Sequence, residues 1–213
     1  MNPVYKGLIY KDFLHLKDSF AVLAVIFLVM SFIVGFGGGG VALYVMLMVL
    51  AVKMVESTLI YDDTNQWDSF VLTTPISRKA IVRSKYLLQI LVIAAASLLA
   101  SAAFLLMTQM ISAITGDSWI LAMLILGFGY AIIYSSAIIP LYLKFGTEKA
   151  RIISYAVLIL VAAVYAVTAG ALLFSGLPNS VLCGTAAVSL AVFGLSYQVS
   201  QRIYAKKDRK SVV

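Results

Sequence analysis

The sequence predicts an all-α membrane protein with six transmembrane helices, in one domain that covers residues 1–213. The first reason is composition, because 62% of the residues are hydrophobic, only 12% are charged, and the mean hydropathy is +1.02. A soluble domain carries about 25% charged residues, so lipid suits most of this chain better than water. The second reason is that the apolar runs are continuous and lack the period-two alternation of a transmembrane barrel.

Six apolar runs are long enough to cross a hydrocarbon core, which takes about 20 helical residues. The predicted spans are Phe20–Phe36, Val41–Ile60, Tyr86–Met110, Trp119–Leu143, Ile152–Phe174 and Val181–Val199. The first two form a hairpin around Gly37–Gly40, since a tight reversal favours glycine. The remaining segments are an interfacial helix (3–19), a polar segment (62–85), a loop (144–151) and a basic tail (200–213), so that spans one and two cover 20–60, three and four 86–143, and five and six 152–199.

The basic residues predict the orientation of these spans. Of the 16 Lys and Arg residues, all except Lys53 lie before span one, between spans two and three, between spans four and five, or after span six. The opposite loops carry none. By the positive-inside rule, both termini of this multi-pass protein face the cytoplasm. The same bias, with attraction to anionic membrane lipid, explains the net charge of +7, so no nucleic-acid partner is expected.

The segment Pro3–Ser19 predicts an amphipathic helix at the membrane surface. On a helical period the apolar side chains share one side: Val4, Leu8, Ile9, Phe13, Leu16 and Phe20. The charged side chains lie largely on the other side: Lys6, Lys11, Lys17 and Asp18. Asp12 and His15 fall at the edges between the two. Such a helix lies in the headgroup plane. It can act as a pivot into span one or as a simple anchor, and the residues alone leave both interpretations open.

The chain lacks the motifs of common membrane enzymes, so we expect no catalytic residue, metal site or cofactor site. It has no Gly-x4-Gly-Lys-Ser/Thr loop for a nucleotide. Its one histidine, His15, lies outside the spans, which excludes an intramembrane Ser–His dyad. A metalloprotease HExxH motif is absent as well. With Glu56 as the only acidic residue in the spans, a proton-coupled or sodium-coupled carrier is disfavoured. Transport would therefore need energy from a partner.

Span two carries two ionisable residues, Lys53 and Glu56. A charge in the middle of the membrane costs about 2.5–3.5 kcal/mol on insertion scales, whereas a spacing of three lets the two side chains pair. One interpretation is a polar lining of a translocation path or a gate. The other is an ion pair that merely borders the interface. Gly127 and Gly129 in span four are interpreted as positions of close helix packing or of local flexibility.

The segment Asp62–Lys85 is the only long polar interruption between two spans. Its start, Asp62–Thr64, can cap the N-terminus of a short helix over Asn65–Leu72. Pro75 disfavours helical geometry at the preceding residue and so ends that helix. Ser77 can cap the next helix, which continues into span three. We therefore predict a helix, a turn and a second helix on the cytoplasmic side.

The short helix would present Trp67, Phe70 and Val71 to the outside. An exposed aromatic group flanked by charges suits a groove on a soluble protein. The alternative is an interfacial elbow with Trp67 dipped into lipid. Aromatic residues near the span ends are interpreted most simply as an interfacial belt. They are Trp67, Tyr86, Trp119, Tyr142, Tyr155, Tyr197 and Tyr204.

The stretch DTNQWDSFVLTTPISRKAIVRSKYL resembles the first cytoplasmic loop of small type-2 ABC exporter permeases of Gram-positive bacteria. Those loops carry an acidic start, a Trp-x-x-Phe step, a Leu-x-x-Pro-Ile-Ser-Arg turn and a basic helix ending in Ser-Lys-Tyr. A second stretch, PLYLKFGTEKARII from Pro140 to Ile153, is similar to the second cytoplasmic loop of the family. The six-span layout agrees too. Within the family, the chain looks like permeases of the phenol-soluble modulin exporter type.

The resemblance implies a location in a bacterial cell membrane and two permease subunits around a central path, and we expect a homodimer. Each subunit would dock a cytoplasmic P-loop ATPase that binds ATP and Mg²⁺. The short helix would couple to that ATPase, beside the N-terminal helix. The coupling positions carried over are Asn65, Gln66, Trp67, Asp68, Ser69, Phe70 and Val71. Many relatives have re-entrant external helices between spans five and six, whereas here only Ser175–Ser180 separates the two spans. Either the external helices are absent, or the outer end of span five near Thr168–Gly170 is itself bent, and the residues alone do not decide between these two forms of the external gate.

The function expected from these observations is an ABC exporter permease for amphipathic cargo. The cargo would be a peptide toxin, an antimicrobial peptide or a lipid-like molecule, because an apolar bundle with few fixed polar groups suits such molecules. One alternative is an immunity or sensor protein that binds peptide without transporting it. A secondary carrier is a further and weaker alternative.

Overall fold

The computed structural model describes residues 6–17, 25, 29, 40–110, 117–175 and 179–206. Over these residues the chain is helical apart from short turns, as the predicted all-α class requires. The first predicted span, Phe20–Phe36, lies outside the described residues except for Val25 and Val29. The turn predicted at Gly37–Gly40 lies outside them except for Gly40.

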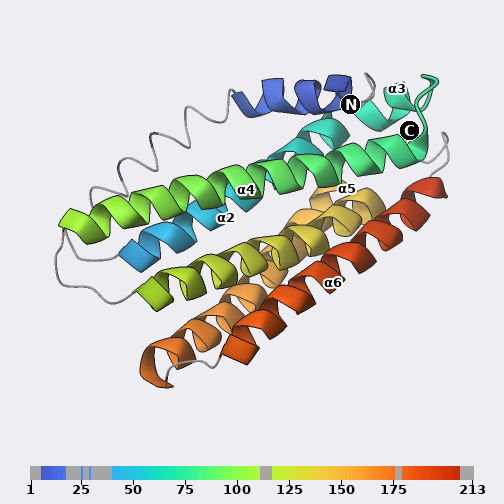
Figure 1. Cartoon of the computed structure of the whole chain (residues 1–213). Helices are drawn as coiled ribbons and strands as arrows, with labels where there is room; N and C mark the ends of the chain where they lie inside the picture. The colour runs from blue at the N-terminus through green and yellow to red at the C-terminus, as the bar shows by residue number, and fades with distance from the viewer. Residues whose placement is uncertain are drawn as a thin grey trace.

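Four long helices form a bundle (Figure 1). They are α2 (Gly40–Thr64), α4 (Arg78–Met110), α5 (Asp117–Ser175) and α6 (Asn179–Ala205), and the short α3 (Trp67–Val71) joins α2 to α4. A further helix over 6–17, the N-terminal helix, precedes them. The end of α2, the start of α4 and the end of α6 gather around α3 (Figure 1). We call this part of the molecule the α3 end.

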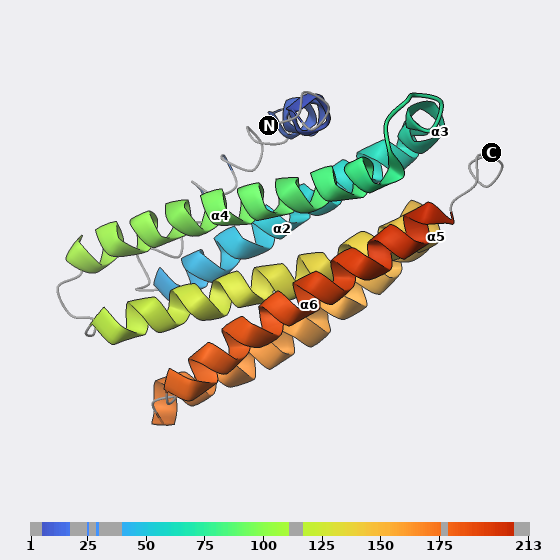
Figure 2. The same cartoon turned by 45° about the vertical axis from the view of Figure 1, so that its right-hand side comes forward.

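The helix α5 is a hairpin of two arms that reverses at Gly146. This glycine has φ 72° and ψ −179°, a conformation that side chains with a Cβ rarely adopt. The rings of Tyr130 and Tyr165 lie 5.4 Å apart, and the Tyr134 hydroxyl is 3.4 Å from the carbonyl oxygen of Ser154. The two arms therefore run side by side (Figure 2). Predicted spans four and five are these arms, and the loop predicted over 144–151 is reduced to the reversal.

Three helices in the described ranges are long and apolar enough to cross a membrane. These segments are Arg78–Ala102, Ile125–Thr168 and Leu182–Ala205. The second is 44 residues long because it contains both arms of the hairpin. The outward surfaces are apolar as well, since Leu98, Ile159 and Leu190 are all exposed. An apolar exterior of this kind is suited to lipid.

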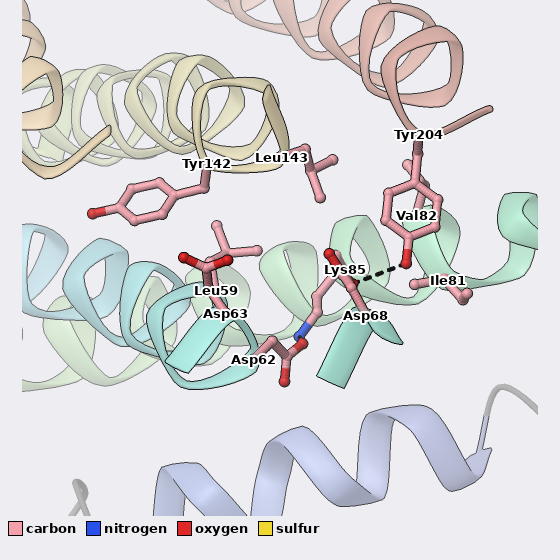
Figure 3. Close-up of a pocket in the computed structure, with 10 residues that line it drawn as sticks. All are labelled: Leu59, Asp62, Asp63, Asp68, Ile81, Val82, Lys85, Tyr142, Leu143 and Tyr204. Atoms are coloured by element: carbon pink, nitrogen blue, oxygen red, sulfur yellow. Dashed lines mark hydrogen bonds and ion pairs between the residues drawn. The ribbon is translucent and has the colours of Figure 1, made fainter. Parts of the chain in front are cut away.

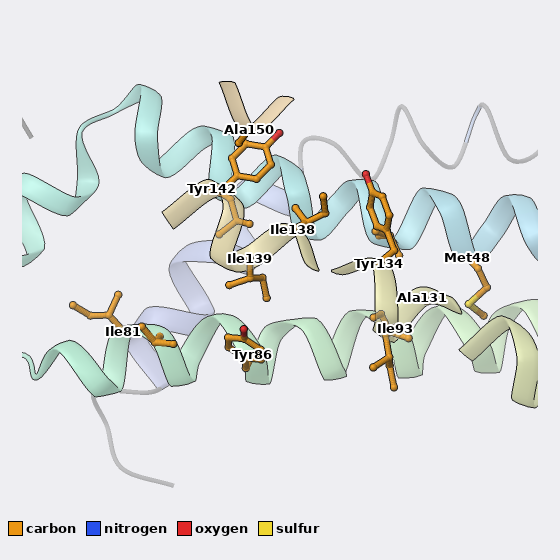
Figure 4. Close-up of a cluster of buried hydrophobic side chains, with 14 of the residues drawn as sticks. Met48, Ile81, Tyr86, Ile93, Ala131, Tyr134, Ile138, Ile139, Tyr142 and Ala150 are labelled. Carbon is orange, nitrogen blue, oxygen red and sulfur yellow. The ribbon is translucent and has the colours of Figure 1, made fainter. Parts of the chain in front are cut away.

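The core lies where α2, α4 and α5 meet (Figure 4). Met48, Ile93 and Ala131 are fully buried there. The ring of Tyr44 packs directly on Gly127, where a Cβ would lie 2.2 Å from Cε1 of Tyr44. Gly127 thus permits α2 to approach α5 closely, in agreement with its interpretation as a packing position.

The N-terminal helix lies at a steep angle to the long helices of the bundle. In Figure 2 this helix is seen end-on, whereas the long helices run across the view. Its Leu16 packs with Met54 of α2 and Leu88 of α4. Its buried face also contains Asp12, which the pattern placed at an edge. Of the predicted apolar side, Leu8 and Leu16 are buried and Phe13 is exposed. The pattern could not place Asp12 because its partner on α4 lies far away in the sequence.

Candidate functional site at the α3 end

The entry to α3 differs from the prediction. Helix α2 continues to Thr64, and Gln66 then takes a left-handed conformation with φ 50° and ψ 35° before α3 begins at Trp67. Asp62–Thr64 therefore form the last turn of α2 and do not cap α3. The hydroxyl of Thr64 donates to the Ile60 carbonyl within α2. The two carboxylates stay on α2 because each has a partner elsewhere in the fold.

The exit from α3 agrees more closely with the sequence. Helix α3 ends at Val71, and the backbone N–H of Thr74 donates to the Val71 carbonyl in the following turn. Pro75 lies in this turn. The Ala80 N–H donates to the Ser77 hydroxyl at 3.3 Å, which confirms Ser77 as the cap of α4.

Four charged side chains form an ionic quartet behind α3. They are Lys11, Asp12, Asp62 and Lys85. The Lys85 ammonium lies 2.9 Å from both Asp12 oxygens and 2.6 Å from Asp62, while Lys11 pairs with Asp62 and lies 3.1 Å from Asp12. Two cations balance two anions. Buried charges are tolerated when paired in this way, so the quartet ties the N-terminal helix to α2 and α4.

Side chains of helix α3 contact two further elements. The Lys11 ammonium lies 4.2 Å from the centre of the Trp67 ring, which joins α3 to the N-terminal helix. The Tyr204 hydroxyl of α6 donates to Asp68 at 2.9 Å (Figure 3). Just before α3, Asp63 at the end of α2 accepts a hydrogen bond from the Thr147 N–H of α5 at 2.8 Å. A displacement of α3 would thus act on the N-terminal helix through Trp67 and on α6 through Asp68.

The predicted coupling residues differ in their access to solvent. Asn65 and Gln66 are exposed, and Phe70 is 59% exposed. Trp67, Asp68 and Ser69 are half-buried. Val71 is fully buried in the bundle core, so the prediction that it faces outward is wrong. Because α3 has only about one turn, its side chains point in different directions. Phe70 faces outward, while Val71 faces the core cluster and packs against it.

A small cavity separates α3 from the ends of the long helices (Figure 3). It is lined by Leu59, Asp62, Asp63, Asp68, Ile81, Val82, Lys85, Tyr142, Leu143 and Tyr204. Its charged lining consists of Asp62 and Lys85 of the ionic quartet, Asp63 of α2 and Asp68 of α3. The cavity gives α3 unfilled space on the side that faces the bundle.

The predicted pairing of Lys53 with Glu56 is confirmed at 2.6 Å. Glu56 is only 3% exposed. Besides Lys53, it accepts hydrogen bonds from Tyr142 at 2.6 Å, Ser154 at 2.9 Å and Tyr134 at 3.3 Å. Because Tyr134 and Tyr142 belong to the first arm of α5 and Ser154 to the second, Glu56 joins α2 to both arms.

Sequence reasoning missed the tyrosines of this cluster. Tyr142 was assigned to an interfacial belt, as were Tyr86 and Tyr204, but all three are buried. Tyr86 instead bonds to Ser200 of α6 at 2.9 Å. The spacing of Tyr130, Tyr134 and Tyr142 in multiples of four was the available signal, since it places them near one face of a helix.

The fold and the α3 end together define the class of protein. It is a membrane protein built as an apolar helical bundle with one polar end. The model of the ABC-2 family transporter proteins matches residues 7–205, and the chain belongs to this family. It is a membrane permease subunit of an ABC transporter, and its ATPase is a separate partner subunit. Among curated proteins and among solved structures, no match was found.

Proposed function

We propose that the protein is the permease of an exporter that moves an amphipathic peptide toxin or antimicrobial peptide out of a Gram-positive bacterial cell. A cytoplasmic P-loop ATPase that binds ATP and Mg²⁺ supplies the energy. The permease has six spans and both termini in the cytoplasm. This orientation rests on the positive-inside distribution of Lys and Arg, which places the α3 end on the cytoplasmic side.

The observation that carries the proposal is the set of contacts that α3 makes. Helix α3 offers Phe70 to the outside and is bound from behind through Asp68 to α6 and through Trp67 to the N-terminal helix. A groove on the ATPase that grips Phe70 moves α3, and these contacts carry the motion into the bundle. Asn65, Gln66 and Ser69 form the polar edge of the contact.

The outer surface supports the proposed cargo and the proposed pairing of subunits. The second arm of α5 is exposed and apolar along much of its length, with Ile152, Ile159 and Val167 all outward. We propose that this arm and α2 face a second copy of the chain, so that a homodimer encloses the path. An amphipathic peptide buries its apolar face on such a surface.

Replacing Phe70 by alanine tests the coupling assignment. We expect the variant to retain the ATPase about tenfold less well on co-purification, because an aromatic anchor in a groove contributes about 1–3 kcal/mol. Uptake of a labelled amphipathic peptide into inside-out vesicles with ATP should fall in parallel. Leu98→Ala is the matched control, since Leu98 is an exposed apolar residue on α4 outside the α3 end. Wild-type retention and uptake in Phe70→Ala would rule out the coupling role.

A further inference from the structure

Lys53 and Glu56 have different surroundings although they form one pair. Glu56 is buried, whereas the Lys53 side chain is 29% exposed. Besides Lys53, three neutral hydroxyl groups lie within hydrogen-bond distance of Glu56, those of Tyr142, Ser154 and Tyr134. The Ser154 and Tyr134 hydroxyls each have one proton and a second acceptor, the carbonyls of Arg151 and Ser154, whereas the Tyr142 hydroxyl donates to Glu56 alone. Hydrogen bonds of this kind stabilise a carboxylate even without a cation. Glu56 therefore joins α2 to α5 through these hydroxyl groups, and we call it the clamp. The Lys53 ammonium is not needed to keep Glu56 in place.

The Lys53 ammonium has hydrogen-bonding capacity left over. An ammonium has three N–H donors. Within the described ranges its hydrogen-bond acceptors are Glu56 at 2.6 Å and the Tyr134 hydroxyl at 3.3 Å. The ring of Tyr155 lies 4.8 Å away and covers one side of the ammonium. One donor thus remains for a group that approaches from the exposed side.

The surface around this ammonium is apolar. Tyr155 is itself exposed, and Ile152 and Ile159 lie one turn before and after it on the second arm of α5. These three side chains form a strip, and Lys53 is the cation beside it. A molecule that fits has an apolar face for the strip and an anionic group for the ammonium.

The position of Lys53 along α2 favours a transported molecule over a resident phospholipid. Lys53 lies nine residues before Asp62, which is about 13 Å of helix at about 1.5 Å per residue. Asp62 belongs to the ionic quartet at the polar end of the bundle, which the proposed orientation puts at the level of the cytoplasmic headgroups. A phosphate at Lys53 would lie deep in the hydrocarbon layer, while a bound amphipathic helix can place a carboxylate there.

We infer that Lys53 and Tyr155 form a binding site for a side-chain carboxylate of an amphipathic peptide whose apolar face lies along Ile152 and Ile159. This inference deepens the proposed function by naming anionic amphipathic peptides as the cargo class. Lys53 moves from Glu56 toward the peptide carboxylate, and the three hydroxyl groups keep Glu56 in place. Glu56 is a positioning residue in this site.

Paired peptides test the site. The probes are two fluorescent amphipathic peptides of Leu, Ser and Glu that are identical except that Gln replaces every Glu in the second. Binding is measured on the permease–ATPase complex in nanodiscs of neutral phosphatidylcholine. We expect the wild type to bind the Glu peptide about tenfold more tightly, as a charged hydrogen bond contributes about 1.5–3 kcal/mol. Equal binding of the two peptides by the wild type overturns the inference.

Variants assign the preference to the ammonium. Lys53→Met should bind the Glu peptide as weakly as the Gln peptide, Lys53→Arg should keep the preference, and Tyr155→Ala should weaken it. A preference that survives in Lys53→Met overturns the site. If Lys53→Met does not yield folded complex, Lys53→Gln, which retains polarity without charge, gives the same comparison. Thermal unfolding of each variant excludes a loss of structure as the cause.

Two further measurements separate the possible failures. Nanodiscs with phosphatidylglycerol test whether a lipid occupies the site. If the preference for the Glu peptide is lost in these nanodiscs and kept in neutral ones, lipid and peptide compete for the same site, which supports the peptide site. If instead Lys53→Met changes only the stability conferred by phosphatidylglycerol and neither peptide's binding, the site holds phosphate and the inference fails. ATP-driven vesicle uptake is scored separately. Selective binding without uptake contradicts the exporter proposal and leaves the peptide site standing.

Discussion

At the scale of single residues, the buried carboxylate of Glu56 decides how α2 meets the hairpin of α5. A lone charge in this position would be costly, because low dielectric disfavours ionised groups. The hydroxyl groups of Tyr134, Tyr142 and Ser154 offset that cost, and all three come from α5. The clamp is therefore specific to one register between α2 and α5.

Replacing Glu56 by leucine should destabilise the bundle by about 3–5 kcal/mol, the usual cost of removing one partner of a buried ion pair. The double variant Lys53→Met/Glu56→Leu should recover part of that loss because no uncompensated cation remains. Thermal unfolding in detergent measures both. Ser57→Ala is the control, since the Ser57 hydroxyl donates to the Met54 carbonyl of its own helix. A Glu56→Leu variant as stable as Ser57→Ala would refute the clamp.

The contact of Tyr44 with Gly127 leads to a second prediction at this scale. A Cβ at Gly127 would overlap the Tyr44 ring, so Gly127→Ala should cost about 1–3 kcal/mol through overpacking. Adding Tyr44→Leu should relieve the overlap and restore part of the stability. Gly184→Ala is the matched control because nothing lies within 4 Å of a Cβ at Gly184. Equal unfolding temperatures for the two alanine variants would contradict the close approach.

At the scale of elements, the polar end works as a set of connections between helices. The ionic quartet joins the N-terminal helix to α2 and α4, and Asp68 joins α3 to α6. These connections do not depend on the apolar surfaces that hold the long helices together. The N-terminal helix is therefore attached both by these ion pairs and by the packing of Leu16 on Met54 and Leu88.

Removing the Lys85 charge should loosen the N-terminal helix. In Lys85→Met, Asp12 and Asp62 lose their shared cation, which costs about 3–5 kcal/mol for a buried pair. A Leu16→Cys probe, buried in the wild type, should then react with a maleimide at least about tenfold faster. The single native thiol is exposed and is removed by Cys183→Ser.

Lys79→Met serves as the control for this experiment, because Lys79 lies on the same helix α4 and is exposed. It should leave the labelling of Leu16→Cys at the rate of the parent. If Lys85→Met and Lys79→Met label equally, the quartet does not hold the N-terminal helix in place.

At the scale of the whole molecule, the predictions from sequence succeed for properties that depend on residues close together in the chain. The all-α class follows from continuous apolar runs, and the α4 cap follows from Ser77 ahead of a helix. The pairing of Lys53 with Glu56 follows from their spacing on one helix. Each depends on neighbours within about a turn of helix, which is the range over which a sequence pattern carries information.

The errors share the opposite property. Asp62 and Asp63 were expected to cap α3, yet their partners are Lys85 of α4 and Thr147 of α5. Tyr142 was expected at the interface, yet it donates to Glu56 from 86 positions away. Each of these residues is polar in a mainly apolar chain. Its hydrogen-bond or ion-pair partner is therefore set by which helix packs beside it, and a sequence pattern does not show that.

The sequence alone therefore determined that lipid surrounds most of this protein, that the chain is helical, and that a polar segment separates two of the apolar runs. Composition and periodicity carry this information because both are local properties. Only the tertiary structure decided that Val71 is buried and Phe70 exposed, that Lys11 and Asp12 meet Asp62 and Lys85, and that Glu56 is held by both arms of α5. The reason is physical, since a buried polar group is stable only beside its partners, and helix packing brings those partners from distant parts of the chain.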